Sequence, residues 1–226
     1  LPLFTRLKRL WMRPVFRGIF HLLSQVQIIG KENIPPQGAY IVAINHLSIF
    51  DPPFVAAFWS TPLEALGAIE IWSKPGQSAL VRLYGVIQVR RGEYDRQSLR
   101  QMLAALEAGR PLMIAPEGGR SHTPGLRRGR PGVAYIVHQT GLPVIPVGVV
   151  GSTDDFLAKA LRAKRPRLEM RIGKPLHLPP ITEKGAQKHT SLQRNADRIM
   201  LAIAELLPPE YRGVYANQNS DTLERA

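Results

Sequence analysis

Short apolar runs alternate with segments of helical spacing along this chain, and this alternation limits its fold more than any other feature. The apolar runs have the length of buried strands, whereas the segments between them carry apolar residues at helical spacing. The predicted strands are residues 26–30, 40–44, 66–71, 85–89, 112–115, 144–150 and 167–172, and the predicted helices are residues 3–26, 54–58, 78–83, 95–108, 133–139 and 191–207. Strands that alternate with helices predict an α/β fold with a mostly parallel central sheet flanked by helices.

Polar groups come directly after several of the predicted strands. His46, Arg91 and the run from Glu117 to Arg120 each stand in such a position. In parallel sheets, ligands bind outside the carboxyl ends of the strands, and these ends lie at one edge of the sheet. The shared placement therefore predicts that these groups form one site.

His46 and Asp51 stand on the two sides of a loop between a predicted strand and a predicted helix. Asp51 is the expected N-cap of that helix, and Pro52 falls in its first turn. On such a loop the carboxylate can fold back onto one imidazole nitrogen. A histidine held in this way can act as a general base, because the carboxylate fixes its tautomer and the other nitrogen takes a proton from a substrate hydroxyl. On these two residues alone, a helix cap and a structural loop histidine remain the alternative.

Cationic and glycine residues beside the other strand ends indicate an anion site. Arg91 can bind phosphate oxygens in pairs through its guanidinium group. Gly118 and Gly119 allow backbone amides to approach an anion closely, and Arg120 adds positive charge. Lys74 lies in a predicted loop and is a weaker candidate. Taken singly, these residues also fit a solvated charge pair and a plain turn.

The chain carries a formal net charge of +13 and no cysteine. The charge points to anionic partners such as anionic lipid, phosphorylated substrates or nucleic acid. The lack of cysteine excludes disulfides and zinc sites built on cysteine. No G-x-S-x-G, Walker, G-x-G-x-x-G or H-E-x-x-H motif occurs in the sequence, which argues against the corresponding hydrolases, nucleotide-binding folds and metalloproteases. The six histidines show no metal-ligand spacing, and nucleic-acid binding has only the charge in its favour.

Residues 1–29 are predicted to form a basic, amphipathic helical segment that associates with a membrane. Apolar and basic residues fall on different helical stripes, with Arg9, Arg13 and Arg17 on the basic one, and no acid interrupts the segment. Pro14 is expected to divide it into a pair of helices. A basic helix that carries Trp and Phe can lie in a membrane interface, where each basic side chain adds about 1 kcal/mol near an anionic surface. An ordinary amphipathic helix packed on the domain is the alternative.

Taken together, these residues resemble the lysophosphatidic acid acyltransferases, the 1-acylglycerol-3-phosphate O-acyltransferases. The first block of that family is Asn-His, four residues and Asp, and the second is an apolar strand from Gly to Arg. The third is Pro-Glu-Gly-Thr-Arg-Ser, and the fourth is an apolar strand with a central proline. The matching segments are Asn45-His46 to Asp51, Gly85 to Arg91, Pro116 to Ser121 and Val144 to Val147. Gly119 stands where threonine is usual, which leaves one hydrogen-bonding hydroxyl unaccounted for.

The resemblance implies an acyltransferase domain of the glycerolphosphate acyltransferase type over residues 30–215, followed by a polar tail at residues 216–226. It implies that His46, oriented by Asp51, deprotonates the sn-2 hydroxyl of 1-acylglycerol-3-phosphate. That oxygen then attacks the thioester of acyl-CoA or acyl carrier protein, and phosphatidate forms without a metal or a resident cofactor. The residues expected to bind the acceptor are Lys74, Arg91, Glu117, Gly118, Gly119 and Arg120.

The partners implied are a lysophospholipid acceptor, the thioester donor and an anionic membrane surface, and nucleic acid is not among them. The expected location is the cytoplasmic face of the cell membrane, as a peripheral protein. The nearest rival is the same chemistry on glycerol-3-phosphate, a glycolipid or a lyso-aminolipid. A rival of another class is a basic membrane-binding protein without enzymatic activity.

Overall fold

The computed structural model describes residues 3–92 and 95–218 of the chain. The strands are β1 (Gln25–Ile29), β2 (Ile41–Ile44), β3 (Glu64–Ala68), β4 (Ile87–Val89), β5 (Leu112–Ile114), β6 (Val144–Val150) and β7 (Arg167–Ile172). The α-helices are α1 (Leu3–Leu23), α2 (Asp51–Phe58), α3 (Gln77–Tyr84), α4 (Arg96–Glu107), α5 (Gly132–Thr140), α6 (Phe156–Leu161) and α7 (Gly185–Leu206). Short 3₁₀ helices are η1 (Lys31–Asn33), η2 (Ile69–Ser73), η3 (Pro209–Tyr211) and η4 (Gly213–Tyr215).

The strands form one seven-stranded sheet in the order β1-β7-β6-β2-β5-β3-β4. From β6 to β4 all neighbours pair in parallel, whereas β7 runs antiparallel to β6 and parallel to β1. The predicted α/β fold with a mostly parallel sheet is thus confirmed. Because β2, β3, β4, β5 and β6 share one direction, their carboxyl ends meet at one edge, where ligands bind in such sheets.

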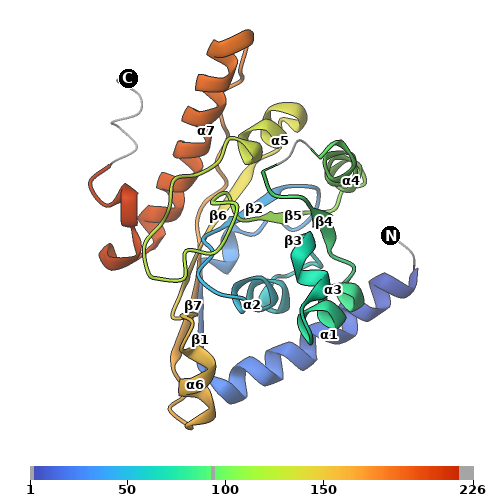
Figure 1. Ribbon diagram of the computed structural model, residues 1–226, viewed down its shortest axis with the longest axis vertical. Coiled ribbons are helices and arrows are strands. Elements are labelled where there is room, and N and C mark those ends of the chain that lie inside the picture. The colour runs from blue at the N-terminus through green and yellow to red at the C-terminus, as the bar shows by residue number, and fades with distance from the viewer. Residues whose placement is uncertain (1–2, 93–94, 219–226) are drawn as a thin grey trace.

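Helices cover both faces of the sheet (Figure 1). Alternate residues of the central strand β2 face two different cores. Ile41 and Ala43 of β2 pack in a core with α4, α5 and α7. Val42 and Ile44 face the other way, into a core with α1, α2, α3 and α6. This arrangement explains why the predicted strands at residues 40–44, 112–115 and 144–150 are continuously apolar, since parallel strands that are buried on both faces need apolar side chains at every position.

The predicted pair of N-terminal helices is wrong, because α1 is one continuous helix with Pro14 inside it. Proline removes one backbone hydrogen bond, the one to the carbonyl four residues earlier. Here that carbonyl belongs to Leu10, and both Leu10 and Pro14 are exposed, so water can satisfy it. Contacts with α2 and α3 hold α1 along its length. They stabilise the helix although one backbone hydrogen bond is missing at Pro14.

The basic stripe of α1 faces the protein. Arg9 is 1% exposed and donates hydrogen bonds to the carbonyls of Tyr84 (2.8 Å) and Gly85 (3.0 Å), at the end of α3. Arg17 donates to the carbonyl of Ala57 (2.6 Å), near the end of α2, and Arg13 donates to the carbonyls just after it. The last carbonyls of a helix lack partners and carry partial negative charge. The arginines of α1 therefore satisfy the C-terminal ends of two other helices.

The opposite face of α1 is apolar and exposed. Its large side chains include Phe4 (67% exposed), Leu7 (54%), Trp11 (71%) and Leu22 (75%). The sequence pattern correctly separated the two stripes. Arg9, Arg13 and Arg17, which were expected to face an anionic surface, donate to carbonyls of the protein instead, and the contact with an anionic membrane stays a prediction. Within the described residues, no helix combines the length and the apolar character needed to cross a membrane.

Several boundaries differ from those predicted. The third strand ends at Ala68 and the chain continues as η2, because β4 pairs with β3 only as far as Ala68. The short helix α6 was not predicted.

The predicted domain boundary after residue 29 falls just beyond β1, which pairs with β7 as part of the sheet. Most of the predicted tail at residues 216–226 lies outside the described residues.

Candidate active site

His46 and Asp51 form a hydrogen-bonded pair at the carboxyl end of β2. His46 Nδ1 lies 2.9 Å from Asp51 Oδ2. A carboxylate can only accept, so Nδ1 carries the hydrogen and Nε2 is left as the basic nitrogen. The Asp51 side chain is fully buried, whereas the His46 side chain is 14% exposed. The predicted fold-back of the carboxylate onto the imidazole is confirmed.

Asp51 is not the N-cap of α2, contrary to the prediction. It is the first residue of the helix, and Phe50 stands at the cap without a side-chain bond. An N-cap side chain normally bonds the amides of the second or third helical residue. Counted from Asp51 as the cap, these would be Pro53, which has no N–H, and Phe54, whose N–H donates to the Phe50 carbonyl at 3.0 Å. The carboxylate instead accepts from the amides of Leu47 (2.7 Å) and Ser48 (2.9 Å) in the preceding loop. The start of α2 thus offers Asp51 no free amide to cap, and its carboxylate is available to His46.

The end of β6 supports this pair from the other side. Ser152 is fully buried, and its hydroxyl donates to Asp51 Oδ1. The Asn45 side chain exchanges two hydrogen bonds with the backbone of Val149, one to its carbonyl (2.9 Å) and one from its amide (2.7 Å). Ser152 was missed by the sequence reasoning, although the rule that found His46 applies to it, since Ser152 also follows a strand of the sheet.

Glu117 lies behind His46 and bonds to protein atoms. It is 2% exposed, and its two carboxylate oxygens accept from the amides of His46 and Arg127, at 2.9 Å each. Ser121, in the same loop, donates its amide to the His46 carbonyl at 2.8 Å. Burial raises the pKa of Glu117 above the ordinary value for glutamate. The Glu117–Ser121 loop therefore holds the backbone of His46 at both its amide and its carbonyl.

A cavity of about 350 Å³ opens at this edge of the sheet. His46, Lys74, Arg91 and Arg120 line it together, so the structure brings four of the predicted site residues to one space. Glu70 also lines it. The remainder of the wall is mainly apolar and comes from α1, α2, β3 and α3, for example at Met12, Phe16, Phe20, Ala56, Leu80 and Tyr84.

Gly118 and Gly119 shape the loop without lining this cavity. Gly118 has a φ of +70°, and a Cβ there would lie 2.8 Å from Arg130 Cδ, so only glycine fits without a rearrangement. A Cβ at Gly119 would lie 3.2 Å from Arg127 Nη2 and 3.7 Å from Arg91 Nη1. Arg127 Nη2 donates to the Gly119 carbonyl at 2.9 Å. With glycine at position 119, the guanidinium group of Arg127 lies close to the place that a threonine side chain would occupy.

The described residues contain no group of three or more His, Asp and Glu side chains that could hold a metal ion. The arrangement at hand is a buried carboxylate, an imidazole with one free nitrogen, and cations beside an apolar space. Such a set can remove a proton from a hydroxyl and bind an anionic, lipid-like molecule next to it.

Comparison with known proteins shows the family of this chain. Residues 25–150 match the family model described as Acyltransferase. A probable 1-acyl-sn-glycerol-3-phosphate acyltransferase of Mycoplasma pneumoniae is 28% identical over 164 residues, which span 64% of this chain and 59% of the relative. A lyso-ornithine lipid O-acyltransferase of Pseudomonas aeruginosa is 26% identical over 219 residues, which span 89% of this chain and 80% of the relative.

A solved structure has the same fold. The crystal structure of the 1-acyl-sn-glycerophosphate acyltransferase PlsC from Thermotoga maritima superposes with a TM-score of 0.61 at 21% sequence identity. The superposition covers 84% of this chain and 77% of that one. At this identity the match speaks for the fold, including the mostly parallel sheet and its flanking helices.

Proposed function

From the premise that this chain belongs to the acyltransferase family of the 1-acyl-sn-glycerol-3-phosphate acyltransferases, we propose that it moves an acyl chain from an acyl thioester to the sn-2 hydroxyl of 1-acylglycerol-3-phosphate. The product is phosphatidate, a precursor of phospholipids. The proposed donor is acyl-CoA or acyl carrier protein. The observation that carries this proposal is the His46–Asp51 pair at the wall of a cavity that also holds Lys74, Arg91 and Arg120.

The proposed reaction begins with His46. Its Nε2 accepts the proton of the acceptor hydroxyl while the hydroxyl oxygen attacks the thioester carbonyl carbon. The C–S bond then breaks, and the imidazolium returns the proton to the leaving thiolate. Asp51 stabilises the imidazolium through Nδ1, and it stays in place because Leu47, Ser48 and Ser152 also donate to it. No covalent acyl-enzyme is needed.

The cations favour an acceptor with a phosphate group. Arg91 and Arg120 supply planar guanidinium groups, and Lys74 supplies a compact charge. A lyso-ornithine lipid carries one carboxylate and one ammonium group in place of the doubly charged phosphate, so it offers less negative charge to the three cations. It is nevertheless the second candidate acceptor, because the lyso-ornithine lipid relative aligns over most of both chains.

The experiment that tests this function is an acceptor panel read by product mass. Lysophosphatidate, glycerol-3-phosphate and lyso-ornithine lipid are each offered with the same acyl-CoA and, in parallel, the same acyl carrier protein thioester. We expect phosphatidate from lysophosphatidate at the highest kcat/KM. A higher kcat/KM for lyso-ornithine lipid would replace the proposed acceptor, and no acyl product with any acceptor would contradict the function.

The apolar part of the cavity suits an acyl chain. Its wall includes Phe16, Phe20 and Leu23 of α1, together with side chains of α2 and α3. The same helix turns Phe4, Leu7, Trp11 and Leu22 outward on its opposite face. One helix thus lies between the apolar cavity and an apolar outer surface. This arrangement supports a substrate-binding space directly behind the exposed stripe.

We propose that this outer stripe of α1 lies in the interface of a membrane. A helix with an apolar face can bury that face at the boundary between headgroups and acyl chains, and the proposed acceptor is itself a membrane lipid. This mode of binding depends on apolar area more than on charge, because Arg9, Arg13 and Arg17 are used inside the protein. The proposed location is peripheral, at the cytoplasmic face of the cell membrane.

Vesicle sedimentation tests this membrane contact. The variant Trp11→Gln/Leu22→Gln removes exposed apolar side chains that have no role in the core, so the fold and Tm should not change. We expect its partition to phosphatidylglycerol vesicles to fall at least tenfold. Leu161→Gln, at a side chain that is 73% exposed on α6, is the matched control and should bind as the wild type does. Equal loss in both variants would contradict a specific role for α1.

A further inference from the structure

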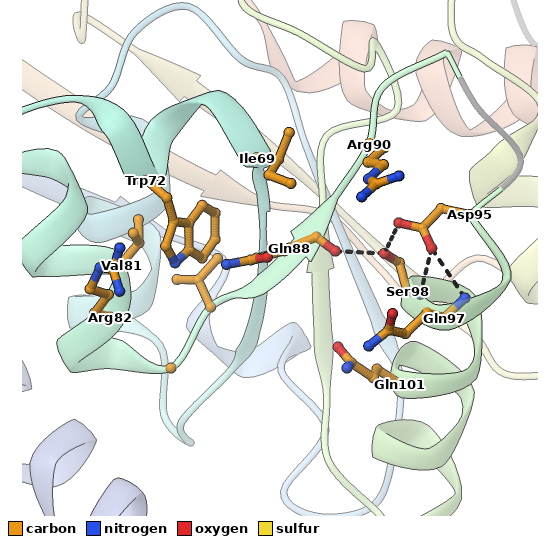
Figure 2. A pocket seen from close by; sticks show the side chains of 12 residues that line it. Ile69, Trp72, Val81, Arg82, Gln88, Arg90, Asp95, Gln97, Ser98 and Gln101 are labelled. Carbon is orange, nitrogen blue, oxygen red and sulfur yellow. Dashed lines mark hydrogen bonds between the residues drawn. The ribbon is translucent and has the colours of Figure 1, made fainter.

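A second cavity, of about 520 Å³, lies on the outer side of β4. β4 is the edge strand of the sheet and pairs only with β3. The walls of the cavity come from η2, α3, β4 and the first turns of α4 (Figure 2). Its volume is typical of small-molecule sites, which measure about 300–1,000 Å³. Nothing in the proposed acyl transfer has so far used it.

Its side chains offer a distinct combination of groups. Arg82 and Arg90 supply two cations, and the indole of Trp72 supplies an aromatic surface. In Figure 2, Trp72 and Arg82 lie on one side of Gln88, and Arg90 lies on the other side. The amides of Gln88, Gln97 and Gln101 add hydrogen-bond donors and acceptors. Guanidinium groups bind phosphate oxygens, amides pair with the edges of a base, and aromatic rings stack on a base.

The carboxylate of Asp95 lines this cavity and is engaged in hydrogen bonds with α4. Asp95 caps the N-terminus of α4 and accepts from the amides of Gln97 and Ser98, at 3.1 Å each, and from the Ser98 hydroxyl. Hydrogen bonds from Ser98 lower the pKa of Asp95, so it stays ionised and directed at the helix. The Gln88 carbonyl lies 2.6 Å from the same Ser98 Oγ, so Asp95 and Gln88 share the single hydroxyl hydrogen, and this contact ties α4 to the edge strand (Figure 2).

The cavity adjoins the one that holds His46. Val81 and Val86 line both of them. At the end of β4 the consecutive residues Arg90 and Arg91 divide between the two, since Arg90 lines the polar cavity and Arg91 lines the cavity of His46. A molecule held by Arg82 and Arg90 can therefore extend a flexible chain past the end of β4 toward the imidazole.

We infer that the polar cavity binds the nucleotide end of a coenzyme A thioester. This inference rests on the proposed function and names the donor for it. Coenzyme A joins an adenine, several phosphate groups and a flexible pantetheine arm that ends in the thioester. The indole and amides match the base, Arg82 and Arg90 match the phosphates, and the neighbouring cavity of His46 receives the arm. A carrier protein presents its pantetheine arm through one phosphate and brings no base, so it would leave this lining unused.

Binding of adenosine 3′,5′-bisphosphate, measured by isothermal titration calorimetry without any acyl donor, tests the site directly. We expect one site per chain, and we expect Arg82→Gln/Arg90→Gln to weaken it by at least about tenfold, because each substitution removes charge-assisted hydrogen bonds. Arg100→Gln removes an exposed cation of α4 that does not line the cavity, and its affinity should stay within about twofold of the wild type. Equal affinity in the double variant and the wild type would overturn the assignment.

Steady-state kinetics separates this inference from the proposed function. With acyl-CoA, Arg82→Gln/Arg90→Gln should raise the KM of the donor by at least tenfold and leave that of lysophosphatidate unchanged. Acyl transfer from carrier protein alone, with no binding of the bisphosphate, would overturn the nucleotide site and keep the acyltransferase. Nucleotide binding that depends on Arg82 and Arg90, without acyl transfer to any acceptor, would support the site and contradict the proposed function.

Discussion

The loop after β2 and the loop after β5 start at the same edge of the sheet, and each carries an acid next to the proposed site of reaction. In the first loop Asp51 turns back to His46, and His46 lines the cavity. In the second loop Glu117 is buried and accepts from the backbone of His46 and Arg127. The first loop thus presents a reacting group, and the second fixes the backbone that carries it. Their position after a strand identifies both loops as parts of the site, but it does not show which loop carries the reacting group and which supports it.

If the first loop supplies the base, His46→Ala should lower kcat by about 10²–10⁴. The fold should persist, because Asp51 keeps its bonds from Leu47, Ser48 and Ser152. Product mass measures the rate, and circular dichroism and Tm check the fold. The double variant His46→Ala/Asp51→Asn should be no slower than His46→Ala, since groups that act as one unit are not additive. Turnover near that of the wild type would remove His46 from the chemistry.

If the second loop acts by support, Glu117→Gln should affect stability as well as rate. The amide nitrogen of Gln cannot accept, so one of the two backbone N–H donors loses its partner, at a cost of about 1–3 kcal/mol. We expect kcat to fall while the acceptor KM changes little, because Glu117 does not line the cavity. Glu107→Gln, at an exposed end of α4, is the control and should change the free energy of unfolding by less than about 0.5 kcal/mol.

The same variant also gives a pH signature. Burial raises the pKa of Glu117 in the folded state, so the folded chain holds that proton more tightly than the unfolded chain. The wild type should therefore lose stability relative to Glu117→Gln as pH rises from the ordinary glutamate pKa through the raised one. Urea unfolding of both proteins across that range measures the difference. If the free energy of unfolding of the wild type instead rose relative to that of Glu117→Gln as pH rises, the ionised carboxylate of Glu117 would be stabilised by its hydrogen-bond partners.

Arg91→Gln is expected to have a smaller and more selective effect. Arg91 lines the cavity of His46, and loss of a bond to a charged phosphate should raise the KM of lysophosphatidate by about tenfold. The KM of the donor should rise less. Arg162→Gln, an exposed position after α6, controls for the change in net charge. An unchanged KM for lysophosphatidate would place the phosphate elsewhere.

The smallest effect is expected for Gly119→Thr. The new Cβ would meet the flexible end of Arg127, whose side chain is 49% exposed and can move aside. We expect less than about a threefold change in the KM of lysophosphatidate and less than about 0.5 kcal/mol in the free energy of unfolding. A change of tenfold or more in that KM would show that the second loop contacts the acceptor, and it would weaken the contrast between the two loops.

Helix α1 shows where the limits of sequence reasoning lie. The spacing of its residues correctly predicted a basic stripe and an apolar stripe, because both follow from the helical repeat. It could not tell which stripe faces inward. That depends on the carbonyls at the ends of α2 and α3, which lie 40 to 76 residues away in sequence and accept from Arg17 and Arg9. The arginines that looked suited to an anionic membrane surface serve these helix ends instead.

The sequence by itself determined the elements whose causes are local or carried by motifs: the family, the alternation of strands and helices, and the return of Asp51 to His46 across five residues. The tertiary structure alone decided which distant groups complete the site. Ser152 reaches Asp51 across 101 residues, and Glu117 reaches the His46 amide across 71. These contacts exist because the sheet places β2 between β5 and β6. Strand order follows from the packing of the whole core, and no short stretch of sequence contains it.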